Sequence, residues 1–165
     1  MENHTIYYDT ITRLTTAISH CKDPEEVALI TAESVKTAFK LKGCSIFIVD
    51  RESRELGLVA SFGLSDEYLN KGPIHFMQTI NEAKDAVPVA IYDVMDDPRI
   101  EYPQEAKNEG IASLLGVPII SHDKIIGALR VYTEKPWEFS LNDITIIQAV
   151  ALICGMAMDM CRMYK

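Results

Sequence analysis

The C-terminal segment, residues 140–163, is the feature that most constrains what this chain can fold into. Ser140 is followed three residues later by Asp143, a spacing that predicts the start of a helix. Behind this start, apolar residues occupy more than one helical face, at Ile144, Ile146, Ile147, Val150, Ala151, Ile153, Cys154, Ala157, Met158, Met160 and Cys161. A helix that is apolar nearly all round must be covered from two sides. We expect a sheet to cover one side, and the N-terminal helices, a partner chain or both to cover the other.

Two further helices are predicted at the N-terminal end, over about residues 3–20 and 24–41. The second begins at Asp23-Pro24, because the carboxylate of Asp23 can accept backbone N–H bonds and Pro24 fits the first helical turn. In the first, gaps of four and three residues create one apolar stripe, formed by Tyr7, Ile11, Leu14 and Ile18. We expect this stripe to pair with the last helix across a dimer.

The middle of the chain, about residues 43–134, consists of β-branched and aromatic runs typical of strands, separated by turns. Strands are predicted at 44–50, 56–62, 88–92, 114–120 and 125–132, and short helices at 66–70 and 103–108. The last two strands are joined by a tight turn, which predicts an antiparallel pair, and Pro118 predicts a bulge or an unpaired position. Strand hairpins bracketed by terminal helices predict an α+β domain with an antiparallel sheet and the helices on one face.

Composition limits the size and the partners of the molecule. A chain of 165 residues has enough mass for one core, so we expect a single domain over residues 1–165. Its 24 acidic and 16 basic side chains give a formal charge of −8. Lysines and arginines are scattered among the acidic residues and form no basic stripe. We therefore expect no nucleic-acid partner.

The expected location is the cytoplasm. The N-terminus lacks the basic-then-apolar run of a secretory signal. The most apolar stretch, Ile144–Met158, is shorter than the ~20 residues that a bilayer requires, so no membrane span is predicted. Four cysteines form no C-x-x-C pair and lie among apolar neighbours: Cys21, Cys44, Cys154 and Cys161. We interpret them as buried thiols in a reducing compartment rather than as disulfides or metal ligands.

Several stretches resemble the GAF domain family, in the same order and with the same spacing. They are Gly-Ile-Ala-Ser-Leu-Leu-Gly-Val-Pro-Ile at 110–119, Ile-Ile-Gly-Ala-Leu at 125–129 and Phe-Ser-Leu-Asn-Asp at 139–143, preceded by matches at 45–50, 61–64 and 93–99. The resemblance extends from about residue 7 to residue 160. It implies a central antiparallel sheet of five or six strands, with the terminal helices on one face. A small-molecule pocket with short helices and loops is implied on the other face.

The ligands known for this family leave different sequence signals. Cyclic-nucleotide-binding members carry Asn-Lys before a Phe-x-x-x-Asp-Glu run, whereas here Ile144 replaces the glutamate and residues 133–135 contain no Asn-Lys pair. Bilin-binding members need a cysteine in the pocket region, and no cysteine occurs between Ser45 and Val150. The same gap argues against the enzymatic branch that reduces free methionine sulfoxide, because that reaction needs a thiolate facing the ligand.

Metal and haem sites have little support in the sequence. His75 is the one plausible axial ligand for haem. The acidic stretch Asp93, Asp96, Asp97 and Glu101 lacks the ligand alternation and the glycine of a calcium loop, so we interpret it as a solvated turn. We assign no catalytic residue, no metal ligand and no cofactor.

The expected function is that of a non-catalytic cytoplasmic signalling or regulatory domain. It would bind an unidentified small molecule and form a homodimer through its first and last helices. Candidate pocket residues are Phe47, Ser61, His75, Phe76, Met77, Tyr92, Ile100, Tyr102 and Leu115. We expect binding to order the segment Gly72–Tyr102 over the sheet and to be felt at the last helix, where a signalling partner protein would connect. Alternatives are a ligand-free dimerisation or protein-interaction module, a cyclic-nucleotide or haem binder, and an enzyme.

Overall fold

The structure is a computed structural model that describes residues 4–50, 52–75 and 87–163. In chain order its elements are α1 (His4–Ile18), α2 (Pro24–Ala38), β1 (Gly43–Val49), β2 (Glu55–Phe62), α3 (Asp66–Leu69), β3 (Ile74–His75), β4 (Val89–Ile91), α4 (Pro103–Glu109), β5 (Ser113–Ser121), β6 (Lys124–Thr133) and α5 (Leu141–Met163). The three long helices and the five longer strands lie where the sequence predicts them, to within a few residues.

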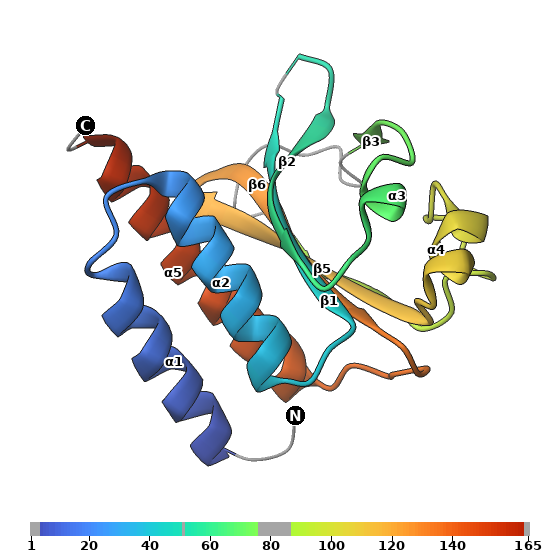
Figure 1. Cartoon of the computed structure of the whole chain (residues 1–165), viewed down its shortest axis with the longest axis horizontal. Helices are drawn as coiled ribbons and strands as arrows, with labels where there is room; N and C mark the ends of the chain where they lie inside the picture. Colours follow the sequence, from blue (N-terminus) through green and yellow to red (C-terminus); the bar gives the residue numbers. More distant parts are fainter. Residues whose placement is uncertain (1–3, 51, 76–86, 164–165) are drawn as a thin grey trace.

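Six strands form one antiparallel sheet with the order β3-β2-β1-β6-β5-β4. This confirms the predicted α+β class (Figure 1). The edge strand β3 was not predicted, because its two residues are too few to show an alternating pattern. The β5–β6 hairpin has the predicted tight turn, in which His122 and Asp123 both take positive φ angles, of 50° and 62°. Pro118 itself is paired in register with Ala128, so the irregularity predicted there is displaced: the register shift of this hairpin lies between Ile119 and Ile120.

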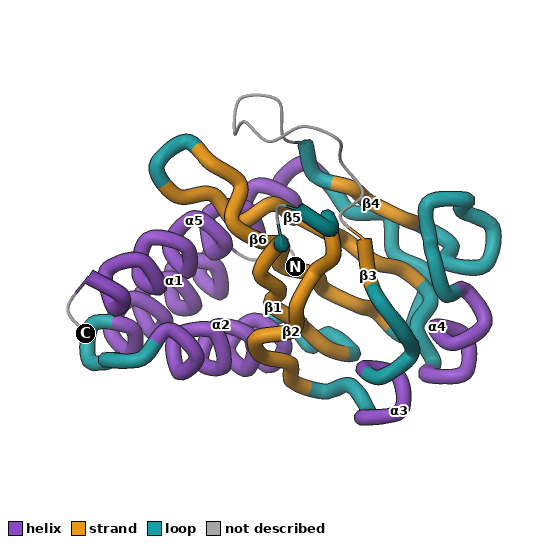
Figure 2. Tube along the Cα trace, turned by 90° about the horizontal axis from the view of Figure 1, so that it is seen from above, coloured by secondary structure: helices purple, strands orange, loops and turns teal. Residues whose placement is uncertain are grey.

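Helices α2 and α5 cover one face of the sheet, which we call the back face (Figure 1). Helix α1 packs on α2 and α5 rather than on the sheet, so it forms an outer layer. Figure 2 shows the same three helices gathered on one side of the strands. Fully buried side chains from both layers meet beneath them, including Leu14, Val27, Ile46, Leu129 and Ile147. The sheet and α2 therefore cover two sides of the apolar α5, and part of its outer face stays exposed.

The start of α5 has the predicted reciprocal cap. The Ser140 hydroxyl accepts the N–H of Asp143 at 3.1 Å, and the Asp143 carboxylate accepts the N–H of Ser140 at 3.0 Å. The same carboxylate also accepts the indole N–H of Trp137 at 3.2 Å. Helix α2 begins as predicted, with Asp23 accepting the N–H of Glu25. It ends at Ala38 rather than at residue 41, because Lys40 takes a left-handed φ of 54°.

Within α5, Leu141–Cys161 is long and apolar enough to cross a membrane by length and composition. The apolar stretch identified in the sequence was shorter, because it stopped at the polar residues near each end of the helix. In the fold, 44% of this helical window is buried, and α5 packs against β5 and α2. Packing in the core accounts for its apolar composition.

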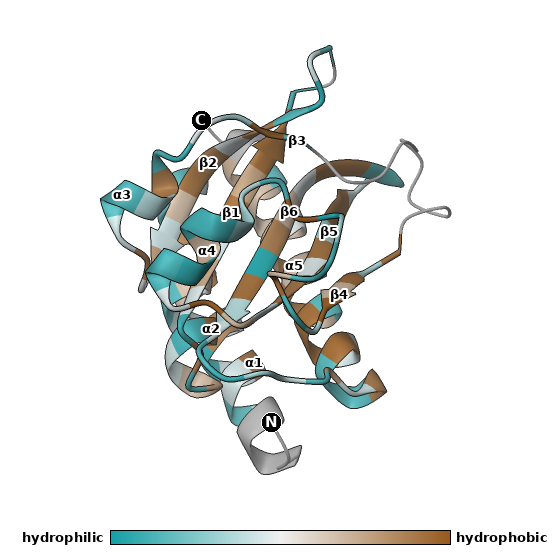
Figure 3. Ribbon diagram, turned by 90° about the vertical axis from the view of Figure 1, so that its right-hand side faces the viewer, coloured by the Kyte–Doolittle hydropathy of each residue, from teal (hydrophilic) through white to brown (hydrophobic). Residues whose placement is uncertain are grey.

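The opposite face of the sheet, which we call the front face, carries α3 and α4 (Figures 1 and 3). Two smaller apolar clusters lie there. One centres on Tyr68, Leu114 and Tyr132 beneath α3 and α4. The other centres on Phe47 and Ala128 beside β3. The side chains between these clusters form the candidate site.

Candidate functional site

Polar side chains from three neighbouring strands lie side by side on the front face. Ser45 of β1 is paired in register with Ser61 of β2 on one side and with Arg130 of β6 on the other. Residues directly opposite each other in antiparallel strands project from the same face. The hydroxyl oxygens of Ser45 and Ser61 are 3.0 Å apart and share a hydrogen bond. The middle of an otherwise apolar face is therefore polar.

Arg130 is the central charge of this face. Its side chain is only 8% exposed, although arginine is seldom buried without a partner. The guanidinium carbon lies 5.5 Å from the centre of the Phe47 ring. On β5, its neighbour in register is Gly116, which has no side chain to cover it. Arg130 therefore extends over the sheet between an aromatic ring and an open backbone position.

Lys71 is a second cation on this face, placed at the C-terminal end of α3. Its ammonium group lies 3.8 Å from the centre of the Tyr68 ring and donates a hydrogen bond to the Tyr68 carbonyl at 3.2 Å. Burial, and to a smaller extent the charge of Arg130, lowers the pKa of Lys71 to about 8. The negative charges of Glu101, Glu105 and Glu109 raise this pKa and so offset part of the decrease. Tyr68 in turn packs edge-on against Tyr132 of β6, with ring centres 6.1 Å apart.

Tyr102 forms the border of the site next to Lys71. Its hydroxyl donates a hydrogen bond to the carbonyl of Pro73 at 2.6 Å, and its ring packs against the Phe47 cluster. Gly72 makes this approach possible: a Cβ at this position would lie 2.5 Å from the Tyr102 hydroxyl. The backbone φ of Gly72, +143°, also favours glycine. We call Ser45, Phe47, Ser61, Lys71, Tyr102 and Arg130 the front-face cluster.

Neither cation of the front-face cluster has an acidic partner in the part of the chain that the structure describes. The ion pairs found there involve His75, Arg99 and His122 instead. Two of the carboxylates that influence Lys71 are bound elsewhere. Glu101 accepts from the backbone and ring of His75, and Glu109 accepts from the backbone and hydroxyl of Ser65.

His75 lies at the sheet edge in β3, and its side chain is 54% exposed. Its ring nitrogen Nδ1 is 2.9 Å from the Glu101 carboxylate, and Nε2 is 3.9 Å from that of Glu55. The hydrogen bond with Glu101 raises the pKa of His75. Glutamate thus already occupies one nitrogen of the histidine that was the one plausible axial ligand for haem. Among the described residues, no group of three or more His, Cys, Asp or Glu side chains could hold a metal ion.

All four cysteines lie on the helical side of the sheet rather than in the front-face cluster. Cys44 and Cys154 are buried in the main core, and burial raises the pKa of both thiols, that of Cys154 to about 11. Burial also raises the pKa of Cys21, which packs against the edge of the same core with Cys161. A thiolate is the reactive form of cysteine, and these environments disfavour it.

The structure brings together three of the predicted site residues, Phe47, Ser61 and Tyr102, and places His75 at the adjacent edge. Ile100 is partly buried against the cluster under α3 and α4, and Tyr92 is 58% exposed. Leu115 does not belong to the site: it is fully buried on the back face, in the core beneath α5. Phe76 and Met77 lie outside the described residues.

Arg130 and Lys71 were missed by the sequence analysis. Arg130 is the only charged residue within the apolar run 125–132, and it shares its alternating parity with Ala128 and Tyr132. An isolated charge in a predicted central strand was therefore an available signal. Lys71 offered no such signal, because it follows a short polar helix where a lysine is ordinary.

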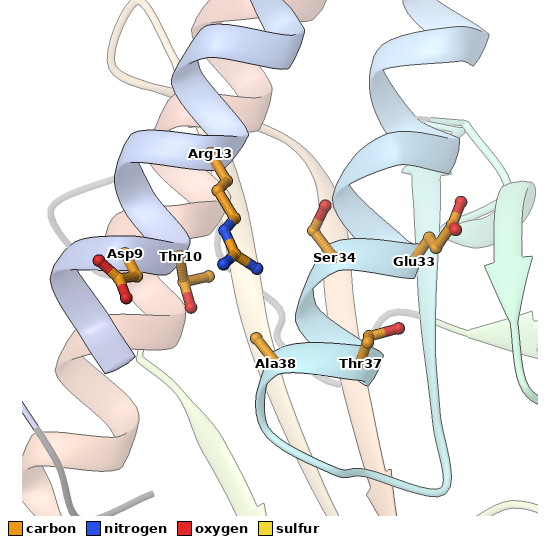
Figure 4. Close-up of a pocket in the computed structure, with 7 residues that line it drawn as sticks. All are labelled: Asp9, Thr10, Arg13, Glu33, Ser34, Thr37 and Ala38. Atoms are coloured by element: carbon orange, nitrogen blue, oxygen red, sulfur yellow. The ribbon is translucent and has the colours of Figure 1, made fainter. Parts of the chain in front are cut away.

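A separate cleft of about 410 Å³ lies between α1 and α2 (Figure 4). It is lined by Asp9, Thr10, Arg13, Glu33, Ser34, Thr37 and Ala38. Arg13 is exposed and shares this cleft with two carboxylates of opposite charge. The cleft is an ordinary solvated boundary between two helices, in contrast to the buried cation of the front face.

Comparisons with known proteins agree with this architecture. The family model described as "GAF domain" matches residues 23–158. A GAF domain from a phosphoenolpyruvate-protein phosphotransferase of Coxiella burnetii superimposes with a TM-score of 0.83 at 18% identity, covering 99% of this chain and 98% of that one. The corresponding Acinetobacter domain gives a TM-score of 0.76 at 20% identity, with the same coverage.

A free methionine-R-sulfoxide reductase from Neisseria meningitidis, solved with its substrate, is also similar. Its TM-score is 0.78 at 22% identity, covering 96% of this chain and 92% of that one. No curated protein matches the sequence. At these identities the structural likeness establishes the fold and leaves the chemistry to be argued from the residues.

Proposed function

Since this chain belongs to the GAF domain family, whose members are generally sensor or regulatory domains, we propose that it is a non-catalytic cytoplasmic sensor. In this proposal it binds a small molecule at the front-face cluster and forms a homodimer through α1 and α5. The observation that carries the proposal is Arg130, a buried cation without a carboxylate partner among the described residues. A buried charge without an opposite charge lowers the stability of the folded protein, so its presence favours a role in ligand binding.

The distribution of nucleophiles supports a non-catalytic role. The similar reductase from Neisseria meningitidis acts on methionine sulfoxide, a reaction for which we expect a reactive thiolate near the ligand. In this chain, all four thiols lie on the helical side, and burial raises the pKa of Cys44 and Cys154. The free cysteines also fit a reducing cytoplasm.

Dimerisation is supported by an apolar stripe on the outer face of α5. Leu152, Met156 and Met160 are spaced four residues apart and are 44%, 55% and 58% exposed. Met156 and Met160 also line a groove of about 970 Å³, together with residues of α1 such as Ile18 and with the segment between α1 and α2, which includes Lys22. The stripe contains no charge, so two copies can meet there across a two-fold axis without like-charge contact, although each chain carries −8.

A structural change at the front-face cluster would reach the outer face of α5 through the sheet. Arg130 belongs to β6, which pairs with β5 along nearly its whole length, and β5 lies directly under α5. A ligand that binds more tightly to one arrangement of these strands would shift α5, and with it the dimer or a signalling partner protein docked there.

Native mass spectrometry of the protein isolated from cells tests this function. A sensor should retain a small-molecule mass on each chain of the dimer. Bare dimers would overturn ligand binding and favour the second candidate, a dimerisation or protein-interaction module. The exposed stripe on α5 supports that candidate equally well. A bound mass on Arg130→Met equal to that on wild type would place the ligand elsewhere.

A further inference from the structure

We propose that the ligand of the front-face cluster is a small molecule with a carboxylate or phosphate group, and that Arg130 and Lys71 bind this anion. The proposal rests on the proposed function, because it names the ligand class of the same site. It starts from the two cations that face the site without an acidic partner among the described residues.

The first argument is the burial of Arg130. At 8% exposure its charge has lost most of its contact with water, and the Phe47 ring 5.5 Å away compensates only in part. A buried charge is ordinarily paired with an opposite one. The neighbouring Tyr132 hydroxyl, whose pKa burial raises, is neutral and supplies no negative charge. An anionic ligand would complete the environment of the guanidinium.

The second argument is the position of Lys71, whose ammonium group has three donors. One donor is used by the Tyr68 carbonyl, and the Tyr68 and Tyr102 ring centres lie 3.8 and 5.8 Å away. Lys71 and Arg130 adjoin the same apolar cluster, because Tyr102 packs against the cluster that contains Phe47, and the guanidinium of Arg130 lies 5.5 Å from the Phe47 ring. Two like charges on one partly buried face, without an acidic partner among the described residues, favour the binding of an anion.

The facing acidic groups do not neutralise this pair. Within residues 4–50, 52–75 and 87–163, the charged and titratable groups around Lys71 are Tyr68 of α3, Glu101 and Tyr102 of the adjoining loop, Glu105 and Glu109 of α4, and Arg130 and Tyr132 of β6. Glu101 and Glu109 are held by His75 and Ser65. Neither of them, nor Glu105, forms an ion pair with Lys71.

The chemistry of the side chains indicates the ligand class. A guanidinium presents a planar fork of donors that matches the two oxygens of a carboxylate or phosphate. The hydroxyls of Ser45 and Ser61 can add hydrogen bonds, and the rings of Phe47 and Tyr102 can contact an apolar part of the molecule. Because the whole chain carries −8, it repels anions at long range, so affinity must come from Arg130 and Lys71.

Isothermal titration calorimetry on the full chain tests the anion site. The probes are inorganic phosphate, glutarate and citrate, with glutaramide as the neutral counterpart of glutarate. We expect at least one anion to bind and glutaramide not to bind. A charge-assisted hydrogen bond contributes enough that Arg130→Met and Lys71→Met should each weaken binding by about 10- to 100-fold. Lys124→Met, which removes a charge at the β5–β6 turn, should leave the affinity within about twofold.

Proton uptake provides a second readout at pH 8. An anion beside Lys71 should raise its pKa above the value of about 8 in the free protein, so binding should take up protons. The observed enthalpy should then depend on the ionisation enthalpy of the buffer in wild type and not in Lys71→Met. Equal binding of glutarate and glutaramide, failure of all three anions to bind, or unchanged affinity in a folded Arg130→Met variant overturns the anion proposal.

Different results would refute the anion proposal and the sensor function. A neutral molecule retained in native mass spectrometry would refute the anion proposal and leave the sensor function standing. A protein that carries no mass and binds none of the probes would refute both.

Discussion

At the scale of single residues, Arg130 sets the candidate site apart from the structural core. Its strand neighbours on the back face, Leu129 and Val131, are fully buried among apolar side chains, as a core requires. Arg130 is nearly as buried on the other face and has no carboxylate partner in the described part of the chain. Selection for stability alone would favour an apolar residue of similar length at this position.

Arg130→Met should therefore fold at least as stably as the wild type when no ligand is present. Replacing a buried charge by an apolar side chain of similar volume is often neutral or stabilising, so we expect the free energy of unfolding to stay equal or to rise by up to about 2 kcal/mol. Urea denaturation followed by circular dichroism measures this. A loss of more than about 1 kcal/mol would show that the guanidinium holds the fold together.

His75 provides a prediction about pH. Its pKa is raised mainly by the hydrogen bond with Glu101, so the folded state favours the protonated ring. The stabilisation from this contact is complete below the pKa of about 6.5 of an unfolded histidine, and it is lost as the pH rises through the raised value. In an NMR titration of the imidazole proton, Glu101→Gln should lower the midpoint of His75 towards 6.5. An unchanged midpoint would show that the hydrogen bond with Glu101 does not raise the pKa of His75.

Helix α5 and strand β5 approach each other closely at the scale of elements. A Cβ at Gly155 would lie 2.8 Å from the Ile120 carbonyl oxygen and 2.9 Å from Cγ2 of Ile119. This contact lies near the register shift that follows Ile119. The glycine therefore allows α5 to pack directly on β5. Strand β5 in turn pairs with β6, which carries Arg130.

Gly155→Ala should be destabilising even though alanine is the better helix former. The gain in helix propensity is about 1 kcal/mol, whereas forcing α5 away from β5 costs about 1–3 kcal/mol. We expect a net loss in thermal denaturation. Gly116→Ala serves as the control, because its Cβ would lie 3.7 Å from the nearest atom, an ordinary contact. Equal stability of both variants would mean that α5 is free to move outwards.

The elements could be predicted from the sequence because each carries a local signal. Capping residues and apolar periodicity locate α2 and α5, and alternation locates the long strands. It was harder to predict which alternate residues of a strand face the helices and which face the candidate site. Leu115 was assigned to the site and lies in the main core, because β5 is apolar on both faces and alternation alone does not show which face turns to the helices.

At the scale of the whole molecule, the fold brings together residues that are far apart in the sequence, and no local sequence pattern predicts such a meeting. Helix α3 returns over the sheet (Figure 1), so that Lys71 and Arg130 adjoin the same cluster of rings, and neither residue signals the other in the sequence. The partner proposed for the α5 stripe would likewise leave no signal in the sequence of one chain. This is why the fold could be predicted almost completely, whereas of the candidate site only Phe47, Ser61 and Tyr102 were named from the sequence.

Met156→Lys should dissociate the dimer expected at the scale of the whole molecule. A charge in the middle of the stripe would be desolvated against the same charge of the second copy, so we expect monomers in sedimentation velocity at micromolar concentration. Gln104→Lys adds the same charge on α4, across the sheet from α5, and should leave the dimer intact (Figure 1). A monomeric wild type would contradict dimerisation through this face.

The most direct measurement is an amide NMR map of the ¹⁵N-labelled wild-type protein titrated with glutarate. We expect shifts concentrated at Ser45, Ser61, Lys71 and Arg130, with none of comparable size when glutaramide replaces glutarate. Shifts confined to the helices of the back face, or an identical response to the neutral diamide, would contradict the claim that the front face holds an anion.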